Sequence, residues 1–157
     1  MRHTIQALVE NRFGVLARIA SLFSARGYNI DSLAVGETQD PTISCMTIIV
    51  NAEDERVLEQ IKKQLRKLID VITVIDLTRR EYIDRELALV KVIKKEDRKK
   101  ILDKISKLDY VKVLEEKEEY YILEICTEHN NLEEILKELK KAGIKELVRT
   151  GKIVMGK

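Results

Sequence analysis

The segment Val-Glu-Asn-Arg-Phe-Gly-Val-Leu, residues 9–16, lies where a strand pattern changes into a helix pattern. Upstream, residues 3–9 place Ile5, Ala7 and Val9 on one face, which is the period-two pattern of a strand. Downstream, the i, i+3, i+4, i+7 spacing of a helix face is kept by Leu16, Ile19, Ala20 and Phe23. We therefore expect a strand, a turn through Asn11 and Gly14, and a helix ended by Gly27.

This turn has features of a small-ligand site. A glycine at a helix start lets another molecule approach the unpaired backbone N–H groups, which attract anions together with the helix dipole. Gly14 lies at the expected start of the helix, and a Gly and an Asn recur in a second segment, Arg26–Asp31. The pattern suggests a small carboxylate ligand. The alternative, which these residues leave open, is that Asn11 is only a cap or turn residue and that Gly14 only accommodates packing.

The order of elements in the first half predicts its fold. Strands are expected over residues 29–37, 42–50 and 70–77, with a turn at Asp40-Pro41. A second helix is expected to open at Glu53 and Asp54, with an apolar stripe formed by Leu58, Ile61, Leu65 and Leu68. The result is β-α-β-β-α-β within about 78 residues, the order of a ferredoxin-like sheet with two helices on one face.

The same order returns in the second half. Helices are expected over residues 95–108 and from Asn130 or Asn131 to Gly143, and strands over 87–93, 110–114, 120–126, 144–149 and 153–155. The fold class is therefore α+β, with two tandem ferredoxin-like βαββαβ domains. We expect the first domain over residues 1–78, a charged linker over 79–85, and the second domain over 86–157.

Composition excludes several classes of protein. The chain has 157 residues, of which 45% are hydrophobic and 36% charged, as in globular proteins. Its net charge of +2 comes from 29 basic and 27 acidic residues that are interspersed, so a basic face for nucleic acid is not expected. No stretch is long and apolar enough to span a membrane, and the N-terminal residues lack a secretion signal's apolar centre. We expect a cytoplasmic protein.

A search for catalytic chemistry finds little. No nucleophile elbow, zinc-protease motif or phosphate-binding loop occurs, and His3 and His129 stand outside any catalytic constellation. Cys126 and His129 form half of a metal motif, which is weak evidence for a structural metal. Cys45 and Cys126 are expected as reduced, buried thiols inside strands. The sequence therefore indicates neither an enzyme nor a metal protein.

Geometry restricts how the two Asn-Gly segments cooperate. The helix from Gly14 to Arg26 is expected to span about 13 residues, or roughly 18–20 Å. Asn11 and Asn29 of one chain then lie at opposite ends of the helix and cannot hold the same small ligand. They meet only across a two-fold dimer, which would have two equivalent sites.

Four stretches of the sequence carry a resemblance to a known family. They are residues 8–19, 22–33, 40–48 and 59–71, which include the Asn-Arg-Phe-Gly-Val-Leu and Arg-Gly-Tyr-Asn-Ile-Asp segments. Together they resemble the small, regulatory subunit of acetolactate synthase, also called acetohydroxyacid synthase. The match is dense through residue 78, and the order and length of the remainder fit the family as well.

The resemblance implies a fold and a function. The first domain would be an ACT domain, which binds amino acids at a homodimer interface, and the second the ACT-like C-terminal domain of the family. Such a subunit has no catalytic centre and no cofactor. It activates a large subunit that carries thiamine diphosphate, magnesium and FAD and condenses pyruvate with pyruvate or 2-oxobutyrate. It commonly confers feedback inhibition by valine, sometimes by leucine or isoleucine.

Site residues carry over from the family to this chain. The effector site of the family maps onto Asn11, Gly14 and Asn29, and apolar walls are expected from Phe13, Val15, Leu16 and Ile30. Two alternatives to this function need features that the sequence lacks. A free-standing ACT-type regulator would need a DNA-binding module, of which the sequence gives no sign. An enzyme in its own right would need a nucleophile or base constellation, which is also missing.

Overall fold

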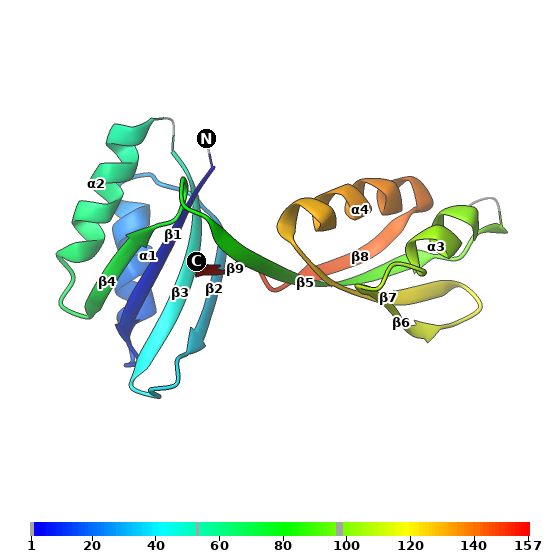
Figure 1. Ribbon diagram of the computed structural model, residues 1–157, viewed down its shortest axis with the longest axis horizontal. Coiled ribbons are helices and arrows are strands. Elements are labelled where there is room, and N and C mark those ends of the chain that lie inside the picture. Colours follow the sequence, from blue (N-terminus) through cyan, green and yellow to red (C-terminus); the bar gives the residue numbers. More distant parts are fainter. Residues whose placement is uncertain (1, 53, 97–98) are drawn as a thin grey trace. The chain divides into compact units, whose positions relative to one another are not determined.

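The computed structural model describes residues 2–52, 54–96 and 99–157, which form two compact units. The first unit comprises the chain up to Ile83 together with Val154–Lys157, and the second comprises Asp84–Ile153. Each unit has a sheet with two helices on one face (Figure 1). The α+β class and the two βαββαβ orders expected from the sequence are confirmed.

The first unit is built on a four-stranded antiparallel sheet. Its strand order is β2-β3-β1-β4, so β1 pairs with β3 on one side and β4 on the other, while β2 is an edge strand. The elements in chain order are β1 (Arg2–Glu10), α1 (Val15–Ala25), β2 (Ile30–Glu37), β3 (Ile43–Asn51), α2 (Glu55–Arg66) and β4 (Val71–Asp76).

The side chains of β1 alternate between the two faces of this sheet. Ile5, Ala7 and Val9 are almost fully buried in the core formed with α1 and α2. Because successive side chains of a strand point to opposite faces, His3 also points to the helix side. Thr4 on the other face is buried as well, so both faces of this sheet are partly covered.

The buried face of α1 differs from the expected stripe. Its buried side chains are Val15, Ile19, Leu22 and Phe23, whereas Leu16 and Ala20 are exposed. The expectation for Leu16 and Ala20 was wrong because the helix starts at Val15 and presents the i, i+4, i+7, i+8 face to the core. Gly27, with a φ of 70°, follows the helix end as expected.

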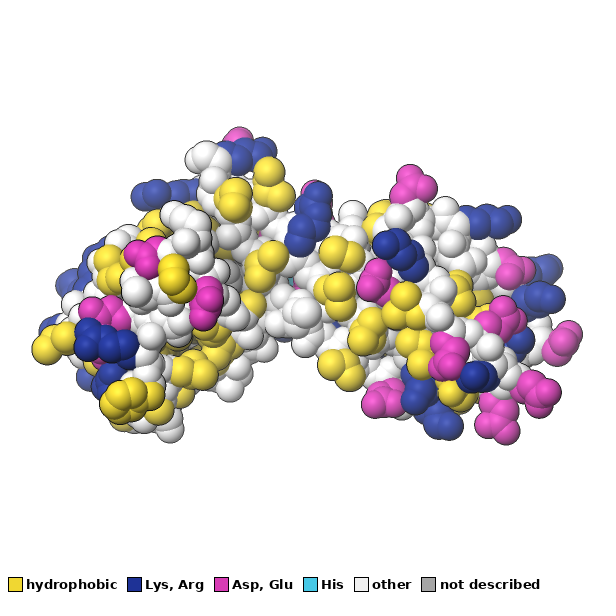
Figure 2. All heavy atoms as spheres, turned by 90° about the horizontal axis from the view of Figure 1, so that it is seen from below, with side chains coloured by type: hydrophobic (Ala, Val, Ile, Leu, Met, Phe, Trp, Pro, Cys, Tyr) yellow, Lys and Arg dark blue, Asp and Glu magenta, His cyan; other side chains and the backbone are white. Residues whose placement is uncertain are grey.

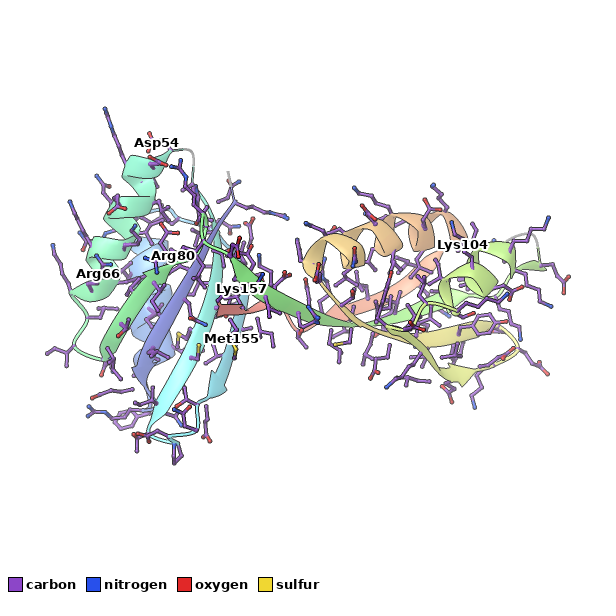
Figure 3. All side chains as sticks on the ribbon, in the orientation of Figure 1. Asp54, Arg66, Arg80, Lys104, Met155 and Lys157 are labelled. Atoms are coloured by element: carbon purple, nitrogen blue, oxygen red, sulfur yellow. The ribbon has the colours of Figure 1, made fainter. Side chains whose placement is uncertain are left out.

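The second helix has a side-chain cap at its start. Asp54 accepts a hydrogen bond of 2.9 Å from the Val57 N–H and lies at the N-terminal end of α2 (Figure 3). Glu53, also expected at this start, lies outside the described residues. The expected side chains Leu58, Ile61 and Leu65 are buried, and Lys62 is buried with them.

The second unit repeats the arrangement with its own core. Its sheet has the order β6-β7-β5-β8, with β5 paired to β7 and β8. Helix α3 ends at Ile105, before the end expected at residue 108, and residues 97–98 of the expected helix lie outside the described residues. The elements are β5 (Tyr82–Ile93), α3 (Lys99–Ile105), β6 (Val111–Glu116), β7 (Tyr120–Thr127), α4 (His129–Ala142) and β8 (Ile144–Arg149).

The C-terminal segment differs most from the expected division of the chain. Strand β9 (Ile153–Gly156) pairs with β5, and Val154–Lys157 belong to the first unit. The Gln6 side chain donates a hydrogen bond of 2.9 Å to the Val154 carbonyl. Figure 3 labels Met155 and Lys157 in this segment. The interval 79–85, expected as a linker, overlaps the start of β5 at Tyr82.

Charges are mixed on the face that Figure 2 presents, where basic and acidic side chains stand interspersed. Within the described part of the chain, fifteen ion pairs join Lys or Arg to Asp or Glu, and in most of them at least one partner is exposed. No helix among the described residues has the length and apolar character needed to cross a membrane.

Candidate functional site

Asn11 joins the turn before α1 to the loop between β2 and β3. Its backbone N–H donates to the Thr42 carbonyl over 2.7 Å. Its side-chain amide donates to the Pro41 carbonyl over 2.9 Å and to Glu37 Oε1 over 3.0 Å. Both amide hydrogens are used, and within the described chain Oδ1 accepts no hydrogen bond. Asn11 therefore presents a fixed acceptor at this loop.

Gly14 is the N-cap of α1 and has a left-handed backbone, with φ 80°. No side chain caps this helix, and its first turn holds no acidic residue. The Arg18 N–H donates to the Gly14 carbonyl over 2.9 Å, and the Val15 N–H reaches the Arg12 carbonyl over a long 3.4 Å. Backbone donors of the first turn thus remain available to an anion.

Arg18 is a neighbour of Gly14 that the sequence did not single out. A Cβ on Gly14 would lie 2.8 Å from Arg18 Nη1, so the guanidinium lies directly beside the glycine. Arg18 Nε also donates to Asp70 Oδ2 over 2.7 Å, which holds the side chain in place. A cation at an uncapped helix start increases the attraction for a carboxylate. The i, i+4 spacing of Gly14 and Arg18 was the available signal.

The apolar residues expected as walls have different positions. Phe13 is 96% exposed and Leu16 is 47% exposed, so both present apolar surface to solvent beside the turn. Val15 is 2% exposed and its side chain belongs to the core. Val15 therefore faces the turn only through its backbone N–H.

Asn29 and Ile30 stand at the start of β2. The Asn29 amide donates to Asp31 Oδ1 over 2.7 Å, and Asp31 also pairs with Arg2 over 3.2 Å. Asn29 is exposed, while Ile30 is half-buried against the core of the first unit. The structure places Asn29 and Ile30 together, apart from the turn at Asn11.

Strand β2 separates the two groups of site residues. Asn11 is bonded to Glu37 at the last position of β2, whereas Asn29 immediately precedes its first position, Ile30. Eight residues of strand span roughly 25 Å at about 3.3 Å per residue. Within one chain, Asn11 and Asn29 cannot contact the same small molecule, in agreement with the expectation from helix length.

The loop opposite Asn11 is ordered by its own hydrogen bonds. The Thr42 hydroxyl and N–H donate to Asp40 Oδ1 over 2.6 and 2.9 Å. These two hydrogen bonds lower the pKa of the exposed Asp40 carboxyl. The Pro41 carbonyl is thereby held where Asn11 reaches it. Glu37 and Pro41 carry no sequence signal for this role, because the contact depends on how the loop folds back.

The residues considered for metal binding have other partners. His129 Nδ1 lies 2.7 Å from Glu86 Oε2, and no group of metal-binding side chains occurs among the described residues. Both cysteines are free thiols. Cys126 is exposed, so the expectation that both are buried was wrong for it, since it lies on the sheet face away from α3 and α4. Cys45 is half-buried, and burial raises the pKa of its thiol.

The fold and the uncapped turn define the first unit as an ACT domain. Residues 5–73 match the family model of the acetolactate synthase (AHAS) small subunit-like ACT domain. Residues 85–157 match the model of the small subunit of acetolactate synthase. The chain belongs to the family of acetolactate synthase small subunits.

Relatives from distant organisms agree with this assignment. The acetolactate synthase small subunit of Aquifex aeolicus is 42% identical over 98% of this chain and 80% of its own length. That of Bacillus subtilis is 38% identical over 96% of this chain and 88% of its own length. The crystal structure of the Thermotoga maritima small subunit, 33% identical, superposes with a TM-score of 0.87 over 100% of this chain and 98% of that one.

Proposed function

We propose that this chain is the cytoplasmic regulatory subunit of acetolactate synthase and acts without a catalytic centre of its own. It would activate a catalytic large subunit, to which the proposal assigns thiamine diphosphate, magnesium and FAD. It would also transmit feedback inhibition by a branched-chain amino acid, with valine as the first candidate. Membership of the small-subunit family supports the partner, and the turn at Asn11 and Gly14 supports the effector.

The observation that carries the effector proposal is the position of Asn11 and Asn29 at opposite ends of an edge strand. Among the described strands β2 pairs with β3 alone and is the last strand on that side of the sheet, so a second chain could pair with its outer edge. If two copies pair β2 antiparallel about a two-fold axis, the end of one strand lies opposite the start of the other. Asn29 of a second copy then comes close to Asn11, and one dimer contains two sites.

Each part of an amino acid has a counterpart in this arrangement. The free N–H groups of the α1 start and the Arg18 guanidinium suit the carboxylate. Oδ1 of Asn11 suits the ammonium group, together with the side-chain carbonyl of a partner's asparagine. Phe13, Leu16 and Ile30 offer apolar surface for a branched side chain.

Inhibition follows if valine binds more tightly to the inactive state of the complex. A coupling of about 1–3 kcal/mol changes activity roughly five- to 150-fold. The direct test is to mix the chain with its large subunit and to assay acetolactate formation with valine, leucine or isoleucine. Activation by the chain is expected, together with inhibition by at least one of the three. Acetolactate formation by the purified chain alone would overturn the regulatory assignment.

The site is tested by Gly14→Asp, which puts a carboxylate where that of the ligand must lie. The variant should activate the large subunit but lose its response to valine. Gly151→Asp is a matched control in the second unit, because Gly151 has a similar φ of 82°. It should keep the response. Unchanged valine affinity of Gly14→Asp in titration calorimetry would show that the site lies elsewhere.

A further inference from the structure

A groove runs between α1 and α2 on the helix layer of the first unit. Figure 1 shows the two helices next to each other on one face of the sheet. The groove has a volume of about 540 Å³ and is lined by residues of both helices and of the turn after α2. Hydrogen bonds join Arg18 to Asp70 at one end and Arg26 to Gln64 at the other. The start of α1 therefore lies beside the end of α2.

The most buried residues of the groove lining are apolar. Leu22 is almost fully buried and Leu68 is half-buried. The α1 side of the groove carries small, exposed residues, which are Gly14, Ala17 and Ser21. Because these side chains are short, space remains between the helices that apolar side chains of a partner can fill.

The charges of the groove are all of one sign. Among the residues that line it, Arg18, Arg26 and Lys67 are basic and none is acidic. Arg18 is compensated by its ion pair with Asp70, which lies outside the lining. The Arg26 guanidinium bonds only uncharged acceptors, and within the described chain neither Arg26 nor Lys67 has an ion pair. Two uncompensated cations therefore line the groove, which is complementary to an acidic partner.

Two large apolar side chains lie at the end of the groove where α1 begins. Phe13 precedes Gly14 and is 96% exposed, and Ile69 follows Leu68 and is 93% exposed. Phe13 is also assigned to the proposed effector site, whereas Ile69 has no role there. Neighbouring exposed apolar side chains next to a polar rim are typical of surfaces that contact another protein.

The cations are distributed along the groove and do not converge on one point. Arg18 and Arg26 are eight positions apart, which is about 12 Å at 1.5 Å per residue of helix. A single carboxylate or phosphate group cannot contact both. A protein segment can do so if its acidic side chains lie about two helical turns apart, with apolar side chains between them on Leu22 and Leu68.

A second copy of this chain does not suit the groove. In a two-fold contact the groove of one copy would meet the same groove of the other, so that cations would face cations. The dimer proposed above uses the edge of β2 instead, and no residue of β2 lines the groove.

We propose that the groove between α1 and α2 docks an acidic, amphipathic segment of the catalytic large subunit. This inference rests on the proposed function, from which the partner is taken. Acidic side chains of the segment pair with Arg26 and Lys67, and its apolar side chains lie on Leu22 and Leu68. The start of α1 belongs both to this groove and to the turn proposed for the effector, so the two proposed sites adjoin.

Charge reversal in the groove tests this docking. The full-length chain and the purified large subunit from the same organism are combined, binding is measured by biolayer interferometry, and activation of acetolactate formation is titrated in parallel. Lys67→Glu and Arg26→Glu should each weaken binding about tenfold or more, because a like charge then faces the acidic segment. Circular dichroism checks that each variant is folded.

The matched controls are Lys63→Glu and Arg56→Glu. They make the same changes at exposed residues of α2 that do not line the groove, and both should bind as the parent chain does. Binding of the parent chain should also weaken as sodium chloride is raised, because salt screens the charge pairs, and Lys67→Glu should reduce this dependence.

The outcomes separate the docking site from the proposed function. If the parent chain neither binds nor activates the large subunit, the proposed function fails and the docking proposal fails with it. If the parent chain does both, but groove variants and controls bind equally well, the docking site alone is wrong. A changed molar mass of the Lys67→Glu chain by itself, without a change in its affinity for the large subunit, would assign the groove to a second copy and also overturn the proposal.

Discussion

The Asn11 side-chain amide donates to the Glu37 carboxylate over 3.0 Å and so ties the turn before α1 to the end of the edge strand β2. With Pro41 as second acceptor, this bond fixes which atom of the Asn11 amide remains for a ligand. The same bond places the turn at one end of the strand that has Asn29 at its other end. The turn proposed to bind the effector is therefore joined directly to the edge strand proposed to pair with a second copy.

Asn11→Asp is expected to weaken valine binding about tenfold or more. The new carboxylate cannot donate to Pro41 or Glu37, and it stands beside a like charge at Glu37, which disturbs the loop. Titration calorimetry of the full chain with valine measures the change. Asn130→Asp, at an exposed asparagine of α4, is the control and should bind valine as the parent chain does. Equal losses in the two variants would contradict the role given to Asn11.

Gly14→Ala is expected to lower the free energy of unfolding by about 1–2 kcal/mol. A residue with a Cβ at a φ of 80° is strained, and the new Cβ would also displace the Arg18 guanidinium. Gly36→Ala is the control, since its Cβ would have nothing within 4 Å and its φ is not left-handed. Urea denaturation should place Gly36→Ala within about 0.5 kcal/mol of the parent chain. An equal loss in both variants would argue against strain at Gly14.

Glu86→Gln is expected to destabilise the second unit by about 1.5–3 kcal/mol, because hydrogen bonds to a buried charge are lost. Glu86 is 4% exposed and accepts bonds from Arg149 Nε and Nη2 over 2.7 and 3.0 Å, and from His129. Glu134→Gln, at an exposed position of α4, should change stability by less than about 0.5 kcal/mol.

The same carboxylate predicts a dependence on pH. Burial alone would raise the pKa of Glu86, but the hydrogen bonds from Arg149 and His129 outweigh it and lower the pKa. A lowered folded-state pKa contributes stability above the unfolded value of about 4.3, and that contribution is lost as pH falls through the folded-state value. Acid titration of the parent chain should therefore show a loss below about pH 4 that Glu86→Gln lacks. Identical acid profiles would refute this linkage.

Val154→Ala is expected to lower the free energy of unfolding of the first unit by about 1–2 kcal/mol, because the substitution removes two buried methyl groups. Val154 is 8% exposed, whereas Met155 beside it is 72% exposed. Met155→Ala is therefore a control from the same strand and should be neutral within about 0.5 kcal/mol. Hydrogen exchange of the backbone amides of β1 measures the stability of the first unit alone. Faster exchange in both variants, or in neither, would mean that the segment does not stabilise this unit.

Much of the fold was predictable because it depends on local patterns. Strand and helix periods gave the order of elements in both units, and the glycines that end or begin α1 were placed correctly. The buried face of α1 was not predictable in detail, because Val15 and Leu16 both begin an acceptable apolar stripe. Only the packing against the sheet selects Val15.

The remainder depends on contacts between residues far apart in the sequence. The bond from Gln6 to Val154 crosses 148 positions, and the bonds of Glu86 to Arg149 cross 63. No local pattern specifies such pairs. At the turn proposed to bind the effector, the sequence singled out Asn11 and Gly14, and that assignment stays a prediction. It did not single out Arg18 or Glu37, whose positions depend on a rotamer and on a loop conformation.

The membership of Val154–Lys157 in the first unit has a consequence for how the chain is made. A ribosome synthesises these residues only after every residue of Asp84–Ile153. During translation the second unit, which is continuous, has all of its residues before the first unit does, although the first unit begins earlier. Until then the nascent first unit lacks Val154, and Gln6 lacks its acceptor, so the unit that starts to fold first is the last to be completed.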